Sequence, residues 1–200
     1  MTSPNATSRE RILANALSLF AARGADAVSV RDIAAAAGVS PALILHHFGS
    51  RERLRQEVDE SVIATFDYLL DAEATTASVT TASVVELMTA GLPPGSPLPA
   101  YVRQLVLTNS PAGSKLFKRW YELTVNVTAQ MDAAGQTNPT DDPAMRAAFL
   151  LANDLALLLL QRHIEDATGV DPLSTAGLQR WATIALGAYT DGVFVPPHPE

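Results

Sequence analysis

The stretch from residue 29 to 53, SVRDIAAAAGVSPALILHHFGSRER, constrains the fold more than any other part of this chain. Ser29 and Asp32 have the spacing of a capping box, in which each side chain accepts a hydrogen bond from the other residue's backbone N–H. Gly38 can take the left-handed conformation that ends a helix without a Cβ clash. Ser40 is a favoured N-cap, and Pro41 suits the first helical position, where its missing N–H costs nothing. The pattern therefore predicts two short helices joined by a tight turn.

A further helix is predicted before this pair. Thr7 and Glu10 form a second capping box, and apolar residues then recur on one helical face from Ile12 to Phe20, ending near Gly24. Two helices joined by a three- or four-residue turn with glycine are typical of the helix-turn-helix, whose second helix enters the major groove of DNA. We therefore expect a three-helix DNA-binding domain over residues 1–55.

The remainder, residues 56–200, is expected to be a larger helical domain, which makes the predicted fold class all-α. Neither a strand of alternating polarity nor a hairpin signal occurs. The segment LPPGSPLP at 92–99 is the clearest break, and the repeated TTASV at 75–84 is interpreted as a linker, with Ser83 and Glu86 capping the next helix. Further helices are predicted over about 99–109, from 111 through the 115–131 stretch, over 143 to about 167, and over about 174–189.

Composition limits the classes of protein that this chain can represent. It contains no cysteine, which excludes disulfides, thiolate metal sites and thiol nucleophiles. The start of the chain lacks the pattern of a signal peptide, and the longest apolar run, 155–160, is too short to span a bilayer, so we expect a cytoplasmic protein. Residues 1–56 carry a balance of +3, whereas residues 57–200 carry −10. This asymmetry fits an anion-binding module joined to a domain that avoids DNA.

Three motifs carry a resemblance to a known family: VRDIA at 30–34, GVS at 38–40, and HFGSRERL at 47–54, which is similar to the signature H-F-x-[ST]-K-E-x-L. Over residues 8–56 the sequence resembles the TetR/AcrR family of one-component bacterial repressors. The resemblance implies a homodimer that binds a palindromic operator and is released by a small, largely apolar effector, with residues 56–200 binding the ligand and forming the dimer. A DNA-binding regulator without a small-molecule ligand is the alternative.

The sequence departs from the family pattern at positions expected to touch DNA. The family commonly has aromatic residues at the two positions that Leu45 and His46 occupy here, and tyrosine is typical at the first. The phosphate contact of that tyrosine is therefore lost or passes to His46. Arg51 replaces the usual lysine and could hold a phosphate with its forked donors. His47 belongs to the signature, yet a structural histidine beside Phe48 is an alternative interpretation. Among the residues expected to bind DNA, the polar ones would contact phosphates and the first apolar ones would face base edges. The residues expected to bind DNA are Arg31, Ser40, Pro41, Ala42, Leu43, Leu45, His46, His47 and Arg51.

No metal or other cofactor is expected. His46 and His47 are adjacent on a helix and would point about 100° apart, and the sequence near them has no cysteine or carboxylate at ligand spacing. The chain also lacks a nucleophile elbow, a phosphate-binding loop and paired histidines with a carboxylate at metal spacing. An enzyme is therefore not expected.

The predicted ligand site centres on the aromatic face of the 115–131 helix, which could line a mostly apolar cavity. Asn153 would offer an orienting hydrogen bond, and plain core packing is the alternative for each residue. The expected lining is Phe66, Leu87, Tyr101, Phe117, Trp120, Tyr121, Thr124, Phe149 and Asn153.

The predicted dimer interface follows from the helix that begins at residue 143. That helix is apolar almost all round and must be covered on both sides. The helix at 174–189 could cover one side, and a partner subunit is the natural cover for the rest. The residues expected at this interface are Leu151, Leu155, Leu158, Arg162, Trp181 and Ala185.

Overall fold

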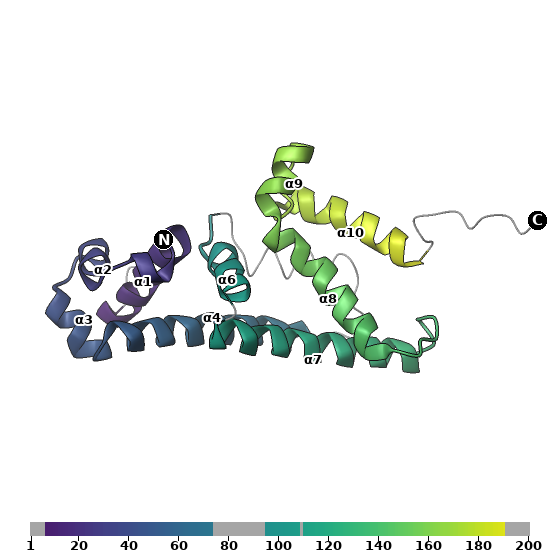
Figure 1. The fold of residues 1–200 in the computed structure, drawn as a ribbon, viewed down its shortest axis with the longest axis horizontal. Coiled ribbons are helices and arrows are strands. Elements are labelled where there is room, and N and C mark those ends of the chain that lie inside the picture. The colour runs from purple at the N-terminus through teal and green to yellow at the C-terminus, as the bar shows by residue number, and fades with distance from the viewer. Residues whose placement is uncertain (1–6, 74–94, 109, 191–200) are drawn as a thin grey trace, which may run out of the picture. The chain divides into compact units, whose positions relative to one another are not determined.

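All regular elements in the described part of the chain are helical, which confirms the predicted all-α class (Figure 1). The structure, a computed structural model, describes residues 7–73, 95–108 and 110–190, and side chains within 7–66 and the two later ranges. The predicted linker at 75–84, the cap formed by Ser83 and Glu86, and the ligand candidate Leu87 lie outside these residues.

The first half of the described chain contains the three predicted helices and the start of a long fourth one. A short 3-10 turn, which the sequence did not predict, connects the first two helices and buries Ala25. The elements are α1 (Ser8–Arg23), η1 (Ala25–Ala27), α2 (Val30–Ala37), α3 (Pro41–Phe48) and α4 (Arg51–Glu73).

The predicted caps of α1, α2 and α3 are confirmed. Capping boxes form at the starts of α1 and α2, where the Ser29 hydroxyl accepts from the Asp32 N–H at 3.2 Å. The Ser29 hydroxyl and backbone N–H in turn donate to the Asp32 carboxylate at 2.6 and 2.8 Å, which lowers the pKa of that carboxyl. Gly38 ends α2 with a φ of 65°, and Ser40 caps α3 by accepting from the Leu43 N–H at 3.2 Å. Local hydrogen bonding thus sets the angle at which α3 leaves the turn.

The core beneath this turn is apolar and fully buried. Helices α1, α2, α3 and α4 each contribute to it, which fixes the orientation of α3 against α1 and α2. Its largest buried side chains are Ile12, Phe20, Val28, Ile33, Ile44, Leu54 and Val58.

The later helices are α6 (Leu98–Leu107), α7 (Pro111–Ala133), α8 (Pro143–Leu159), α9 (Gln161–Thr168) and α10 (Thr175–Thr190). The prediction of one helix from 143 to about 167 was wrong, because the chain bends by 70° between α8 and α9 at Leu160. The bend lets Ile164 pack on the buried pair Leu157 and Leu178, a long-range contact that helical periodicity does not report. No single helix in the described ranges is long and apolar enough to cross a membrane; by length and composition only α8 and α9 together could.

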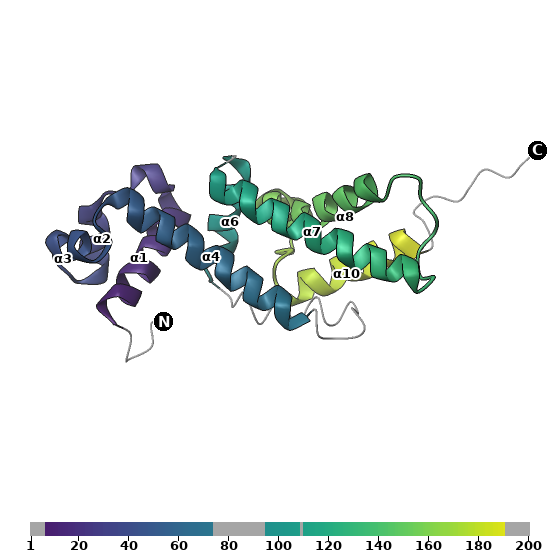
Figure 2. The ribbon, with the colours of Figure 1, turned by 90° about the horizontal axis from the view of Figure 1, so that it is seen from below.

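The chain divides into two compact units. The first comprises residues 1–68 and 95–152, and the second comprises residues 69–94 and 153–200. Helices α6 and α1 pack together within the first unit. Helix α4 leaves the helix-turn-helix and runs past α6 (Figure 2). The helix-turn-helix is therefore built into a larger body.

Candidate DNA-binding interface

Helix α3 has one buried side and one exposed side. Ile44 and Phe48 lie in the core, as predicted, and Leu43 is half-buried. Pro41, Ala42, Leu45, His46 and His47 are exposed, and Leu45 keeps 46% of its surface accessible. The exposed side therefore holds most of the α3 residues that the sequence assigned to DNA.

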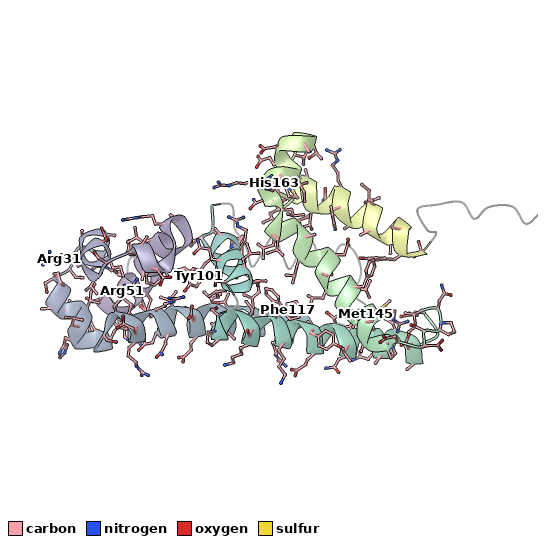
Figure 3. The ribbon with its side chains drawn as sticks, in the orientation of Figure 1. Arg31, Arg51, Tyr101, Phe117, Met145 and His163 are labelled. Atoms are coloured by element: carbon pink, nitrogen blue, oxygen red, sulfur yellow. The ribbon has the colours of Figure 1, made fainter. Side chains whose placement is uncertain are left out.

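Two polar candidates lie beside this surface. The Ser40 hydroxyl oxygen is used as the helix cap, which leaves its O–H proton available to a phosphate oxygen. Arg31 is exposed in the first turn of α2 (Figure 3), and among the described residues it has no hydrogen-bond or ion-pair partner. Its guanidinium is thus available for a phosphate.

The two histidines pack against one another at the end of α3. Their ring centroids lie 5.7 Å apart, and His47 also contacts the Phe48 ring edge-on at 6.2 Å. Both remain exposed, so the contact with Phe48 leaves the His47 ring accessible. In the described ranges no group of three histidine or carboxylate side chains is placed to hold a metal ion.

Arg51, which the sequence assigned to a phosphate, directs its guanidinium at two backbone carbonyls. Its Nε donates to the Val28 carbonyl at 2.9 Å, and its Nη2 donates to the Ala25 carbonyl. The side chain is only 26% exposed and lies 3.9 Å from the Glu52 carboxylate. The forked guanidinium therefore holds the start of α4 to the turn before α2, and two of its donor directions are already occupied.

Other arginines also attach α4 to the helix-turn-helix. Arg9 forms an ion pair with Glu57 and lies 5.3 Å over the Phe48 ring, whereas Arg55 pairs with Asp26 at 3.0 Å. Arg53, which the sequence reasoning missed, is exposed, and no partner of its side chain lies in the described residues. Positions two apart on a helix face roughly 200° apart, so the inward direction of Arg51 predicts the outward direction of Arg53.

Helix α6 is joined to the helix-turn-helix by two hydrogen bonds. The Tyr101 hydroxyl donates to Asp59 Oδ1 in α4 at 2.6 Å, and the Gln104 amide donates to the Ala21 carbonyl in α1 at 2.9 Å. The Tyr101 ring stacks on Phe20 at 6.2 Å and is 1% exposed. Burial raises the pKa of both the Asp59 carboxyl and the Tyr101 hydroxyl. Tyr101, which the sequence assigned to a ligand site, is thus a core residue that connects α6 with α1 and α4.

The other expected ligand residues are distributed between core, surface and the second unit. Trp120 is buried and meets Phe66 edge-on at 5.3 Å, and the Thr124 hydroxyl donates to the Trp120 carbonyl. Phe117 and Phe149 are exposed. In the second unit the Asn153 amide donates to the Tyr189 hydroxyl at 2.8 Å. Of the expected ligand residues, Phe66 and Thr124 therefore both contact Trp120.

An open depression of about 580 Å³ lies along α7 and the start of α8. Tyr121, the one expected ligand residue in its lining, donates from its hydroxyl to the Ala144 carbonyl at 3.3 Å. The lining combines charged and apolar groups, which the sequence reasoning did not bring together: Arg119, Glu122, Val125, Asn126, Thr128, Ala129, Asp132 and Pro143.

The residues expected at the dimer interface are unevenly exposed. Leu151 and Leu155 are buried within the chain, and Trp181 packs on the Leu157–Leu178 pair. Leu158 and Ala185 are half-buried, and Arg162 is exposed. Among the large apolar side chains that the structure describes, Ile184 on α10 has the largest exposed fraction, and Leu186 and Tyr189 on the same helix are also exposed. The predicted interface did not include these three residues.

The capped helix pair, the exposed side of α3 and the accessible arginines beside it define a helix-turn-helix DNA-binding protein. Residues 12–58 match the profile "Bacterial regulatory proteins, tetR family", and residues 95–195 match "Tetracyclin repressor-like, C-terminal domain". The chain belongs to the TetR family and is a DNA-binding transcriptional regulator.

Characterised relatives are regulators of the same type. The chain is 31% identical over 199 residues to the HTH-type transcriptional regulatory protein RaaS of Mycobacterium tuberculosis, covering 96% of this chain and 90% of RaaS. It is 43% identical over 53 residues, 26% of each chain, to the repressor KstR2 of Mycolicibacterium smegmatis. These relatives are transcriptional regulators, so the family points away from an enzyme.

Solved structures share the fold. SmeT, the repressor of a multidrug efflux pump of Stenotrophomonas maltophilia, superposes with a TM-score of 0.69 at 24% identity and covers 98% of this chain and 97% of its own. The fatty acid degradation regulator FadR of Bacillus halodurans superposes with a TM-score of 0.72 at 16% identity and covers 94% of this chain and 99% of its own.

Proposed function

We propose that this regulator is a repressor that binds a palindromic operator as a homodimer and is released by a small, largely apolar effector. The relatives named as repressors support the first part, since they are similar to this chain over its DNA-binding segment. The observation that carries the second part is the pair of hydrogen bonds from α6 to α1 and α4. Through these bonds a movement of α6 would act directly on the body that holds α3.

On DNA, α3 would lie in the major groove with its exposed side toward the bases. Arg31, Ser40, His46 and His47 would contact phosphates, and Arg53 joins them as a further candidate. The apolar residues Pro41, Ala42, Leu43 and Leu45 would face base edges. Arg51 is assigned a positioning role, because its donors already bind the carbonyls of Ala25 and Val28.

Release by an effector would pass through α6. A shift of α6 displaces Tyr101 and Gln104 and so pulls on Asp59 in α4 and on the end of α1. In a dimer this changes the spacing of the two α3 helices from the 34–36 Å or so that matches one helical turn of DNA. Such a change requires an effector with unequal affinity for the two arrangements. The regulator would act in the cytoplasm, where bacterial DNA lies.

The second unit supports the homodimer. Ile184 is 70% exposed on α10, and Leu186 and Tyr189, three residues apart on another side of the same helix, are exposed together. Exposed apolar side chains in a group mark sites of protein association. Partner contacts are proposed for these three together with the residues expected from the sequence that remain accessible: Leu158, Arg162, Trp181 and Ala185.

A regulator without a small-molecule ligand is the alternative function. It is favoured by the positions of Tyr101 and Trp120, which pack in the core, and of Phe149, which is 62% exposed. A thermal-shift screen against medium-chain fatty acids, aromatic acids and lipophilic cations separates the two functions. A compound that binds the folded protein raises its Tm by an amount that grows with the logarithm of its concentration, whereas the alternative predicts no shift with any compound class.

DNA binding is tested by selecting duplexes from a random-sequence pool with the full-length protein and measuring affinity by fluorescence anisotropy. We expect one enriched palindromic sequence, and we expect any compound that raises the Tm to weaken binding to it. Enrichment without a palindrome contradicts the homodimer. A compound that raises the Tm but leaves the affinity for DNA unchanged contradicts release by an effector.

A further inference from the structure

The exposed side of α3 has an unusual chemistry for a surface that reads DNA. Its first turn and a half presents Pro41, Ala42 and Leu45, none of which has a side-chain hydrogen-bond donor or acceptor. Leu45 is 46% exposed, and in the described part of the helix-turn-helix it is the large apolar residue with the most accessible surface. The polar residues, Ser40 and His46, lie at the two ends of this apolar strip.

Apolar side chains can recognise only one feature of the major groove. Base edges there present two kinds of feature: hydrogen-bond donors and acceptors, and the C5-methyl group of thymine. A leucine or alanine side chain cannot form hydrogen bonds with the first kind. Contact with that methyl removes apolar surface of both partners from water. The chemistry of the strip therefore selects methyl groups.

We propose that Leu45, with Ala42 beside it, determines sequence specificity by contacting the C5-methyl groups of thymines in the operator. The proposal rests on the proposed function, since it concerns how the same α3 surface chooses its DNA. It assigns Leu45 to base readout, although a tyrosine at this position in the family would contact a phosphate.

The geometry of α3 favours Leu45 over its leucine neighbour. Leu43 is half-buried, and Ile44 next to it is fully buried. Leu45 lies three residues after Ala42 and four after Pro41, so the three side chains are neighbours on one helical face. Because Leu45 is outside the core, shortening it changes the DNA surface without opening a cavity.

The test uses the duplex selected from the random pool, resynthesised with deoxyuridine in place of individual thymidines. Deoxyuridine lacks only the C5-methyl group. We expect the Kd to rise about fourfold at each contacted thymine, and about 15-fold when both half-sites are changed. In a second arm, a contacted T·A pair is replaced by C·G or by 5-methylcytosine·G. Tighter binding of the 5-methylcytosine duplex shows that the methyl group itself is recognised.

Three variants locate the contact. Leu45→Ala should bind thymidine and deoxyuridine duplexes with equal affinity, whereas Leu45→Met, which keeps a long apolar side chain, should retain most of the discrimination. Leu107→Ala removes a leucine of α6 that is 63% exposed, more than Leu45, and should discriminate as the wild type does. Circular dichroism should give all three variants the wild-type helix content.

The outcomes are distinct. Equal binding of thymidine and deoxyuridine duplexes by the wild type overturns methyl recognition. Discrimination that survives in Leu45→Ala overturns the assignment to Leu45. If the random pool yields no preferred duplex, the proposed function itself fails, and this inference fails with it.

Discussion

The Tyr101 hydroxyl donates a hydrogen bond of 2.6 Å to Asp59, and this single bond joins α6 to the long helix that continues from α3. Tyr101 is buried and Asp59 is half-buried. A hydrogen bond to a carboxylate shielded from water is stronger than one at the surface. The pair is therefore a specific connection between α6 and the DNA-binding helices.

Tyr101→Phe removes the donor and leaves the Asp59 carboxylate poorly solvated. We expect the free energy of unfolding to fall by about 1–3 kcal/mol, a drop in Tm of roughly 2–4 °C for each kcal/mol. Thermal unfolding followed by circular dichroism measures the change. Asp59→Asn is the matched control, because its amide oxygen still accepts from Tyr101 and it should cost less. A larger loss in Asp59→Asn than in Tyr101→Phe contradicts this account of the bond.

Arg51 is predicted to support the fold. Arg51→Ala removes the bonds to the Val28 and Ala25 carbonyls and should lower the free energy of unfolding by about 2–3 kcal/mol. Arg51→Lys should not restore it, because an ammonium cannot reproduce the planar fork. Urea unfolding measures both variants. Stability equal to the wild type in Arg51→Ala, together with weaker DNA binding, would return Arg51 to the phosphate contacts.

Arg31 is predicted to act on DNA alone. Since its side chain is exposed, Arg31→Ala should leave the Tm unchanged, weaken binding to all duplexes and reduce the slope of log K against log salt by about one. Lys115→Ala, which removes the same charge from an exposed position on α7, should leave the slope unchanged. A salt titration by fluorescence anisotropy measures the slope for each variant. Equal slopes for Arg31→Ala and the wild type would contradict a contact between Arg31 and a phosphate.

Gly113 allows α7 to start directly against α6. A Cβ atom at this position would lie 2.0 Å from the Leu105 carbonyl oxygen, which is backbone and cannot move aside alone. Gly113→Ala should therefore cost about 1–3 kcal/mol of stability. Gly187→Ala is the control: a Cβ there meets no atom within 4 Å, so alanine should stabilise α10 by about 1 kcal/mol. Similar Tm changes of the same sign in both variants would contradict the close α6–α7 packing.

The Asp154 carboxyl should make the free energy of unfolding depend on pH. Desolvation raises the pKa of its carboxyl to about 6 from an ordinary value of 3.8. Between these values the folded chain holds a proton that the unfolded chain has lost, so stability falls as pH rises through about 6. Asp154→Asn should therefore be more stable than the wild type at pH 7.5 and similar to it at pH 4. Because Asp154 is partly exposed, the gain should be modest. Urea unfolding at both pH values measures it, and an equal difference at each contradicts the shift.

Much of the DNA-binding half could be predicted from the sequence because local signals determine it. Capping boxes, a left-handed glycine and a serine-proline start act within four residues, and each was found where it was predicted. The burial of Ile44 and Phe48 follows from the same helical period. The direction of the Arg51 side chain could not be predicted from such local signals, because its acceptors at Ala25 and Val28 are more than twenty residues away.

The C-terminal half was less predictable because long-range packing decides it. The bend at Leu160 contains neither proline nor glycine, and it depends on the packing of Ile164 against Leu157 and Leu178. An aromatic face at helical spacing can line a cavity or fill a core with the same pattern. Tyr101 and Trp120 fill the core, and only the positions of their neighbours show this.

If two copies of α3 read one duplex in symmetric positions, a hydroxyl-radical footprint on the selected duplex will show it. We expect two protected segments related by the palindrome and centred one helical turn apart, about 34–36 Å. A single protected segment, or protection without any preference for sequence, would contradict it.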